Sequence, residues 1–366
     1  MTNLTISAIE AIPVAVPMKH PIKWARGAIR ELDHVIVVVR LSNGVEGIGD
    51  AAPRPTVYGE TQRSIVEIIQ AHLAPRLMGL GAFETARCTS LMAEVIGNLA
   101  AKAAVDIALH DACGKTLGIS CAEMLGGRPR PIPLNWRIRS TAKSDVLAEA
   151  ERMMHQYGFR ALKMKCGLDI PADISLLEAV RHQVGDDVEI SVDMNQAYTP
   201  DQLLTAIPEL ERLGIALIEE PLPARDRRGK LLAAQQTRIP FTGDDSCTTL
   251  DDVRDELELG AIRSVVIKCV RTGFTISREI LALTKAFHCA VHNGSNADMH
   301  ICSMASAHFA CAYETSHAHE MSYFADEDCS VVDQPIELKD GCMIVPDRPG
   351  IGLGLDAKML AKYRVD

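Results

Sequence analysis

The chain is constrained most strongly by a series of short apolar strands that alternate with longer amphipathic segments. We expect seven of these strands, at residues 133–138, 161–165, 188–193, 216–219, 241–244, 264–268 and 289–292. From the second strand onward, their last residues recur at intervals of 24 to 28 positions. Strands that alternate with helices form parallel βαβ units, and so regular a repeat favours a closed barrel over an open sheet. The segment 130–332 has room for seven or eight units of such a barrel.

The residues before this series show the pattern of an α+β segment. Up to about residue 60, apolar and polar positions alternate, and Asn43-Gly44 follows the apolar run 35–39. This arrangement is typical of an antiparallel sheet with a tight turn. From Glu60 to Gly118 the apolar positions take helical spacing, so we expect helices there.

The last residues show a β pattern again. Residues 336–346 are largely apolar and contain Lys339-Asp340-Gly341 as a turn, so we expect this tail to return to the N-terminal sheet. The chain is therefore predicted to contain an α+β segment over 1–129, a barrel over 130–332 and a C-terminal return over 333–366. The first and last of these segments would form one discontinuous domain.

Composition excludes two classes of partner. Lys and Arg number 38 against 48 acidic residues, which gives a net charge of −10, and no basic run would hold a phosphate backbone. Nucleic acid is therefore excluded. A membrane is excluded as well, because the longest uncharged run, about 301–313, falls short of the ~20 residues that cross a membrane. The N-terminal stretch is expected to be a strand and not a signal peptide.

Cysteine usage favours a cytoplasmic location. The eleven cysteines include no C-x-x-C pair and no metal-ligand spacing, and a chain of 366 residues does not need a disulfide framework.

We expect a small-molecule carboxylate as substrate and assembly as a homo-oligomer, with the number of subunits left open.

Charged residues close the apolar strands of the predicted barrel. In a parallel barrel the C-terminal ends of all strands meet at one face, where charged residues are typical of a catalytic site. A single strand-end acid is more often a solvated loop residue or a helix cap, but six charged residues on five strands favour a site. They are Lys163, Lys165, Asp193, Glu219, Asp244 and Lys268.

Three of these residues, Asp193, Glu219 and Asp244, are carboxylates on neighbouring strands. Without a cation between them they would repel one another and raise each other's pKa. Ligation by oxygen alone favours Mg²⁺, with Mn²⁺ as a substitute, over zinc, which would recruit His or Cys. The residues just beyond these ligands are expected to orient the ligands or the lysines. They are Asn195, Glu220 and Asp245.

Two lysines, Lys165 and Lys268, flank the predicted ion from opposite sides of the barrel. A lysine serves as a base only when its pKa is lowered, which a nearby cation and partial burial provide. Lys163 adds like-charge repulsion to Lys165 in the same direction. A divalent Lewis acid and a tuned lysine base are what proton abstraction next to a carboxylate requires, so we predict a metal-dependent proton-transfer enzyme.

The motifs at these positions resemble those of the enolase superfamily, and within it the muconate-lactonizing-enzyme subgroup. The helix segment 108–127 and the closing segment 340–350 are also similar to the family, so the resemblance covers nearly the whole chain. The motifs at the site are Lys163-Met164-Lys165 for the family's K-x-K, the strings VDMN, IEEPL and GDDS at 192–195, 218–222 and 243–246 for the three metal ligands, and Ile267-Lys268 for the second lysine.

The resemblance implies a modified (β/α)₇β barrel with a capping domain formed from both termini. It also implies that Mg²⁺ binds the substrate carboxylate and that Lys165 and Lys268 act on opposite faces of the α-carbon. If one lysine removes the proton and the other returns it, the centre inverts. If a β-substituent leaves, an alkene forms, so racemisation, epimerisation and dehydration share one set of residues.

The substrate depends on the cap loops and the last barrel strands. Dipeptide epimerases of this subgroup carry Asp-x-Asp at the eighth strand, where this chain has HAHEM at 317–321, so a dipeptide is disfavoured. The segment with Asn293 and Asn296, together with Trp24 and Tyr58 in the expected cap loops, resembles the cis-3-hydroxy-L-proline dehydratases. That resemblance implies a small hydroxylated ring held by aromatic side chains.

The leading hypothesis is therefore a Mg²⁺-dependent lyase, a cis-3-hydroxy-L-proline dehydratase, with 2-epimerisation as a competing outcome. A same-fold alternative is a racemase or epimerase without elimination, acting on a proline betaine, an N-acylamino acid or a dipeptide. An alternative of another class is a non-catalytic binding protein on this fold. The complete set of bases and ligands argues against the last alternative.

Overall fold

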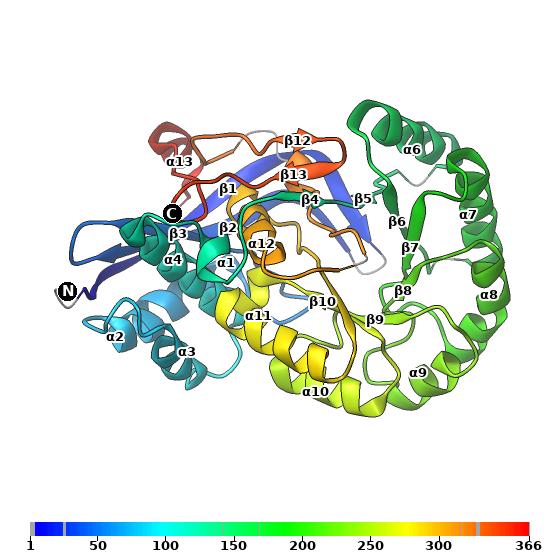
Figure 1. Cartoon of the computed structure of the whole chain (residues 1–366), viewed down its shortest axis with the longest axis horizontal. Helices are drawn as coiled ribbons and strands as arrows, with labels where there is room; N and C mark the ends of the chain where they lie inside the picture. Colours follow the sequence, from blue (N-terminus) through cyan, green and yellow to red (C-terminus); the bar gives the residue numbers. More distant parts are fainter. Residues whose placement is uncertain are drawn as a thin grey trace.

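A computed structural model of the chain describes residues 4–365 except 25–26, 141, 168, 316 and 327–329, without the side chains of residues 20–30. An antiparallel sheet with its helices occupies one side, and a curled parallel sheet inside a ring of helices occupies the other (Figure 1). This arrangement confirms the predicted (β/α)₇β barrel with an α+β cap.

The N-terminal sheet contains three antiparallel strands, which are β1 (Ile6–Trp24), β2 (Gly27–Leu41) and β3 (Glu46–Ala51). The predicted turn joins β2 to β3, where Gly44 has a φ of 84° that favours glycine. The pairing of β1 with β2 and of β2 with β3 places β2 in the middle of the sheet.

The middle strand is apolar on both faces. Successive side chains of a strand point to opposite faces. Val35, Val37 and Val39 pack among the cap helices, whereas Ile36 and Val38 belong to the core that the cap shares with the barrel. Burial of both faces explains why this run is continuously apolar.

The central cap helix packs very closely on β3. A Cβ atom added at Gly47 would lie 2.0 Å from the carbonyl oxygen of Ala108, and one added at Gly49 would lie 2.0 Å from that of Ala104. Glycine is therefore required at both positions. The cap helices are α1 (Gln62–Glu67), the π-helix η1 (Ile68–Leu73), α2 (Ala74–Leu77), α3 (Thr85–Ala93), the central α4 (Leu99–Leu117) and α5 (Cys121–Met124).

The parallel sheet contains seven strands in sequence order, so each predicted barrel strand is present. Its strands are β5 (Trp136–Arg137), β6 (Ala161–Lys165), β7 (Glu189–Asp193), β8 (Leu217–Glu219), β9 (Phe241–Gly243), β10 (Ser264–Ile267) and β11 (Ala290–Asn293).

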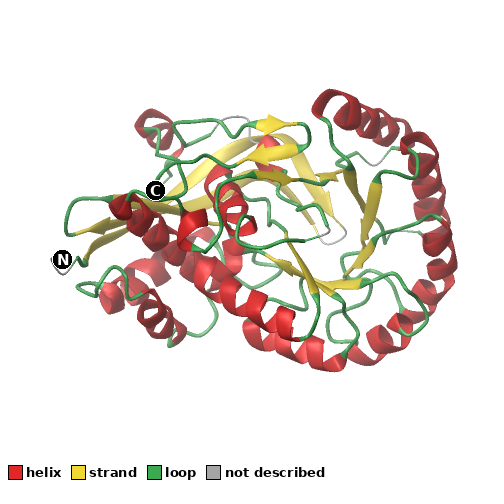
Figure 2. Cartoon of the chain, in the orientation of Figure 1, coloured by secondary structure: helices red, strands yellow, loops and turns green. Residues whose placement is uncertain are grey.

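Helices surround this sheet on the outside (Figure 2). They are α6 (Lys143–Tyr157), α7 (Ile170–Val184), α8 (Pro200–Arg212), α9 (Arg227–Ala234), α10 (Leu250–Leu259), α11 (Cys269–Ala286) and α12 (His300–Ala310). Over the described residues, no helix combines the length and the apolar character needed to span a membrane.

Local sequence signals set the ends of the barrel helices. Thr199 and Thr249 form capping boxes with the third residue of α8 and α10. Gly158 and Gly260 end α6 and α10 with φ values of 76° and 74°. These signals start and stop the helices so that the chain re-enters the sheet at regular intervals.

An eighth segment closes the barrel between β11 and β5. The backbone N–H of His319 donates to Pro133 O at 3.0 Å, and Asn135 N donates to His319 O at 2.9 Å. On the other side, Glu320 N donates to Asn293 O at 2.8 Å. The string HAHEM therefore occupies the position of the eighth strand.

The tail differs from the prediction in its partner. Its predicted hairpin forms from β12 (Leu338–Lys339) and β13 (Cys342–Ile344), but β13 pairs with β4 (Pro131–Pro133) and not with the N-terminal sheet. The chain reaches that sheet later, because Val365 N, beyond α13 (Ala357–Tyr363), donates to a carbonyl oxygen of β1 at 3.0 Å. A 3₁₀ helix, η2 (Tyr323–Asp326), precedes the tail. The three segment boundaries stay a prediction.

Asp106 of α4 ties the cap to the barrel. Its carboxylate accepts hydrogen bonds from Phe274 N at 2.6 Å, Thr275 N at 3.1 Å and Thr275 Oγ1 at 2.6 Å, all within α11. Asp106 is buried, so its removal would leave these donors without a partner.

We expect Asp106→Ala to lower the free energy of unfolding by about 3 kcal/mol, because buried hydrogen bonds to a charged group are lost. Urea unfolding measures this change. Asp251→Ala is the control, since that side chain is 82% exposed, and it should change stability by less than about 0.5 kcal/mol. Equal effects of the two substitutions would contradict this role of Asp106.

Candidate active site

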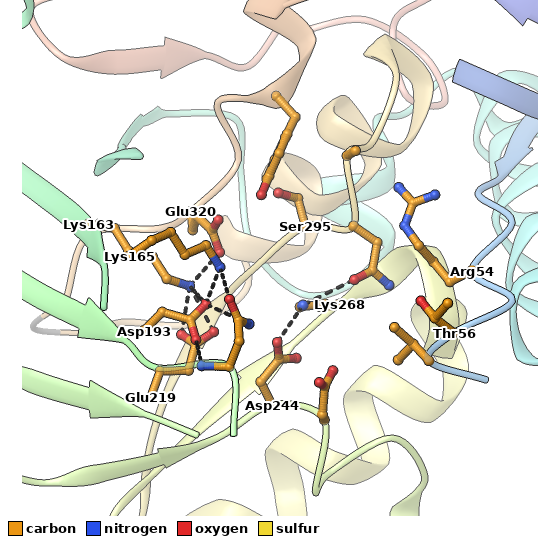
Figure 3. Close-up of a pocket in the computed structure, with 16 residues that line it drawn as sticks. Arg54, Thr56, Lys163, Lys165, Asp193, Glu219, Asp244, Lys268, Ser295 and Glu320 are labelled. Atoms are coloured by element: carbon orange, nitrogen blue, oxygen red, sulfur yellow. Dashed lines mark hydrogen bonds and ion pairs between the residues drawn. The ribbon is translucent and has the colours of Figure 1, made fainter. Parts of the chain in front are cut away.

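Six charged side chains meet at the C-terminal ends of the barrel strands (Figure 3). The strand register places Lys165 beside Asp193, and Asp193 beside Glu219. The structure thus brings the predicted residues together, whereas their roles stay predictions. By element, Lys163 and Lys165 lie on β6, Asp193 ends β7, Glu219 ends β8, and Asp244 and Lys268 directly follow β9 and β10.

A cavity of about 80 Å³ opens among these side chains. Because acidic, basic and amide side chains line most of it, the cavity suits a small polar molecule. The cap and the barrel both contribute to its wall, so the site lies where the two parts meet. Besides the six charged residues, the wall contains Arg54, Thr56 and Val57 of the cap, and Asn195, Asp245, Ser295, Asn296, Ala297, Glu320 and Tyr323.

Lys163 lies among the acidic side chains and is only 2% exposed. Its ammonium donates to both carboxylate oxygens of Glu219 at 2.8 Å and to Glu320 at 2.9 Å, and Asp193 is 3.4 Å away. Burial lowers the pKa of Lys163, but these three carboxylates outweigh burial and hold that pKa well above its ordinary value. Lys163 therefore stays charged and neutralises the acids.

Lys165 is held by one carboxylate and one amide. Its Nζ donates to Asp193 Oδ2 at 2.5 Å and to Asn195 Oδ1 at 2.8 Å. Burial lowers the pKa of Lys165, but the Asp193 carboxylate outweighs burial and leaves that pKa raised.

Lys268 has the same two kinds of partner. Its Nζ donates to Asp244 Oδ2 at 2.7 Å and to Asn296 Oδ1 at 3.1 Å. Because β10 is four strands from β6 in the barrel, this lysine lies across the carboxylates from Lys165 (Figure 3). Burial again lowers the pKa, and Asp244 again outweighs burial and leaves the pKa of Lys268 raised.

Without a cation, the pKa of both lysines is raised and not lowered, so the expected lowering, which assumes a nearby cation, stays a prediction. The direct ion pairs with Asp193 and Asp244 decide the sign, and the sequence does not reveal these distances. Additional positive charge at the carboxylates is needed before either lysine loses its proton near neutral pH.

The three carboxylates titrate differently although all are buried. Burial and the neighbouring acids raise the pKa of Glu219 well above its ordinary value, despite the charge of Lys163. Asp193 and Asp244 face the same burial, but the lysines beside them lower their pKa, to about 2 for Asp244. Of the three carboxylates, Glu219 is therefore the one whose negative charge is least offset by nearby positive charge.

These acids suit a divalent ion in their chemistry. Among the described residues, no group of three or more His, Cys, Asp or Glu side chains is spaced to hold a metal ion, and ammonium groups lie against all three carboxylates. The donors are nonetheless oxygens, the ligands that Mg²⁺ prefers, and the raised pKa of Glu219 marks the deficit that a cation would relieve. Asp193, Glu219 and Asp244 would hold it.

The other predicted residues differ in their positions relative to the cavity. Asp245 lines the cavity, and its carboxylate accepts a hydrogen bond from Gln196 Nε2 at 2.9 Å. Tyr58 stands behind the wall, with its hydroxyl against Asn296. Asn293 does not reach the cavity, since its fully buried side chain bonds to Ser306 O and Tyr313 Oη at 2.5 Å. The side chain of Trp24 lies outside the described residues.

Other residues of the site were not predicted. Arg271 donates to Asp244 Oδ1 at 3.0 Å, and Glu320 accepts from Lys163. Applying the strand-end rule to the eighth strand would have identified Glu320. Arg54 and Arg271 lie in a loop and a helix, where no periodic signal marks them.

Lys163 should stabilise the fold by offsetting the charge of the buried carboxylates. We expect Lys163→Met to lower the free energy of unfolding by roughly 3–5 kcal/mol, because buried carboxylates lose their charged partner. Urea unfolding in a chelating buffer measures this loss. Arg212→Met is the control, since its ion pairs are about half exposed and should contribute far less than the buried pairs of Lys163. A loss no larger than that of the control would contradict this role of Lys163.

Two family models match the chain. One, described as "Enolase C-terminal domain-like", matches residues 145–359. The other, described as "Mandelate racemase / muconate lactonizing enzyme, N-terminal domain", matches residues 8–126. The two matches thus follow the barrel and the cap in turn.

Known enzymes are similar over almost the whole length. The chain is 32% identical to "Muconate cycloisomerase 1" of Pseudomonas putida, over 99% of both proteins. It is 29% identical to "L-Ala-D/L-Glu epimerase" of Bacillus subtilis, over 96% of this chain and 97% of the relative. The solved muconate lactonizing enzyme from Mucobacterium Smegmatis, complexed with muconolactone, superimposes with a TM-score of 0.96 at 34% identity, over 99% of this chain and 100% of the other.

Proposed function

We propose that this chain, which belongs to the mandelate racemase and muconate lactonizing enzyme family of the enolase superfamily, removes a proton next to a substrate carboxylate. Lys165 and Lys268 are the bases, and Asp193, Glu219 and Asp244 are the ligands of a divalent ion. The observation that supports this proposal best is the position of two lysines, Lys268 buried and Lys165 partly exposed, on opposite sides of one group of carboxylates.

Enzymes of this family use a divalent metal, usually Mg²⁺. An ion held by Asp193, Glu219 and Asp244 would supply positive charge that stabilises the charge developing on the substrate carboxylate and offsets the negative charge beside the two lysines. A lysine released from its carboxylate loses the interaction that raises its pKa. Burial then lowers that pKa, and the lysine can act as a base.

Protons then pass between the substrate and the two lysines. One neutral lysine accepts the α-proton, and the electron pair of the broken C–H bond moves into the carboxylate. If the opposite lysine, as an ammonium, returns a proton to the other face, the centre inverts. If it instead protonates a departing β-hydroxyl, the electron pair forms a C=C bond and water leaves.

The substrate that we favour is cis-3-hydroxy-L-proline, which carries a β-hydroxyl on a small ring. Charged and amide side chains make up most of the cavity wall, which includes Asn296 and Thr56 for a hydroxyl or ring nitrogen. Loss of the α-proton and of the 3-hydroxyl makes the chain a hydro-lyase, with 2-epimerisation as the competing outcome.

A second candidate is isomerisation without loss of water. The similarity to a muconate cycloisomerase and to an L-Ala-D/L-Glu epimerase favours it. A dipeptide remains the weaker choice within this group, because Glu320 is engaged by Lys163 and the buried His319 ring bonds to Asn293 N at 3.0 Å. A purely binding role is disfavoured, since it would leave two lysines held against carboxylates in one cavity without a chemical role.

Incubation in D₂O with Mg²⁺ tests the proposed chemistry. We expect proton NMR to show loss of the α-proton of cis-3-hydroxy-L-proline, together with the dehydrated product. Lys165→Ala and Lys268→Ala should each reduce turnover by about 10²-fold or more, because each removes one proton-transfer group. Retention of the α-proton in the parent enzyme, across proline and 3-hydroxyproline isomers, would contradict the proposal. Exchange or inversion without loss of water would select the second candidate.

Metal binding provides an independent test. Mn²⁺ binding, measured by electron paramagnetic resonance, should weaken about tenfold or more in Asp193→Asn and in Glu219→Gln, because each loses an anionic oxygen ligand. Asp251→Asn, an exposed acid outside the site, should bind Mn²⁺ as the parent does. Unchanged binding in both site variants would show that the ion lies elsewhere.

A further inference from the structure

The amide of Asn296 connects the cap to one of the two lysines. Its Oδ1 accepts from Lys268 Nζ at 3.1 Å, and its Nδ2 donates to Tyr58 Oη at 2.8 Å. Its backbone N–H donates to Asp298 Oδ1 at 2.6 Å. Both ends of the amide are therefore engaged, and its orientation depends on Tyr58.

The other lysine has no such connection among the described residues. Asn195 presents Oδ1 to Lys165, but its Nδ2 donates to Asp193 Oδ2 at 3.3 Å and its backbone N–H to Asp193 Oδ1 at 2.9 Å. All of these groups belong to the barrel. The two lysines thus differ in what orients their amide partners.

Tyr58 is well placed to act as a support. It does not belong to the cavity wall, so its hydroxyl acts on Asn296 and not on a molecule in the cavity. Its backbone N–H, with those of Val57 and Gly59, donates to Arg54 O at 3.0–3.2 Å. Burial raises the pKa of Tyr58, so the hydroxyl stays neutral.

The loop that carries Tyr58 is itself anchored to the cap. The carboxylate of Glu60 accepts from Ala100 N at 3.0 Å and from Ala101 N at 3.2 Å, at the start of α4. A carboxylate at a helix N-terminus is a favourable arrangement. The support is therefore continuous from α4 through the loop to Asn296 and Lys268.

We propose that Tyr58 is a positioning residue for Lys268, acting through Asn296, so that the cap controls proton transfer on one face of the substrate only. This inference rests on the proposed function, in which Lys165 and Lys268 serve opposite faces of the α-carbon. Without the Tyr58 hydroxyl, the Asn296 amide loses a partner and Lys268 loses its fixed direction. Proton transfer depends on such alignment, whereas Lys165 keeps every contact.

Two substrate isomers that differ only at the α-carbon distinguish the contribution of Lys165 from that of Lys268. The probes are cis-3-hydroxy-L-proline and its α-epimer, trans-3-hydroxy-D-proline, each at saturating concentration with Mg²⁺ in D₂O. The initial rate of α-proton loss is measured by NMR. Lys268→Ala identifies the isomer whose proton Lys268 removes, as the one that loses its α-proton more slowly in this variant.

We expect Tyr58→Phe to slow α-proton loss about tenfold for that isomer and less than about twofold for the other. Asn296→Ala should produce the same asymmetry. Tyr58→Phe added to Asn296→Ala should cause little further loss, because both substitutions break one connection.

Tyr198→Phe is the matched control. It deletes a tyrosine hydroxyl that donates to Asp173 Oδ2 at 2.8 Å outside the cavity wall, and it should leave the ratio of the two rates unchanged. Thermal unfolding of each variant confirms that the fold is intact.

Equal slowing of both isomers by Tyr58→Phe, or fully additive losses in the double variant, would overturn the inference and leave the proposed function intact. Retention of the α-proton of both isomers by the parent enzyme would overturn the proposed function, and the inference with it.

Discussion

The ion pair between Lys163 and Glu219 is the contact on which the site depends. The barrel buries several acids at one end, and a buried carboxylate is costly unless a positive charge lies against it. Lys163 meets this need for Glu219 and Glu320 at once, and Asp193 is within 3.4 Å. Burial and the neighbouring acids still leave the pKa of Glu219 raised, so Lys163 does not fully offset the buried negative charge, and the proposed divalent cation would offset the rest.

The cap contributes more than a cover over this site. Gly47 and Gly49 bring the β3 backbone against α4, and the carboxylate of Asp106 on that helix holds the start of α11. The same cap carries Tyr58 to the amide beside Lys268. A connection from the cap to one lysine gives the two sides of the site different mechanical support, although their chemical groups match.

The main elements of the site could be predicted because the barrel repeats. Strand periodicity fixed where Asp193 and Lys268 fall, and parallel strands bring such ends together. Glu320 escaped because the strand-end rule was applied only to the apolar strands, and the eighth segment has no apolar run. Arg271 escaped because it lies on a helix, where spacing does not distinguish a site residue from a solvated one.

Other differences arise from distances that a sequence does not contain. The sign of the lysine pKa shifts depends on direct contact with Asp193 and Asp244. Asn293 was expected to contact the substrate just beyond a strand, yet it ends β11 and its side chain turns to Ser306 and Tyr313 in the core. The tail hairpin was predicted correctly, but β patterning alone does not reveal that β13 pairs with β4.

The proposed function requires that Lys165 and Lys268 stand on opposite faces of the carbon next to the substrate carboxylate. An ion held by Asp193, Glu219 and Asp244 would bind that carboxylate. A crystal structure with Mg²⁺ and pyrrole-2-carboxylate, a planar analogue of a deprotonated proline, tests it most directly. We expect the three carboxylates to bind the ion, and Lys165 and Lys268 to approach the carboxylate-bearing carbon from opposite sides of the ring. Both lysines on one side of the ring, or an ion bound away from these carboxylates, would contradict it.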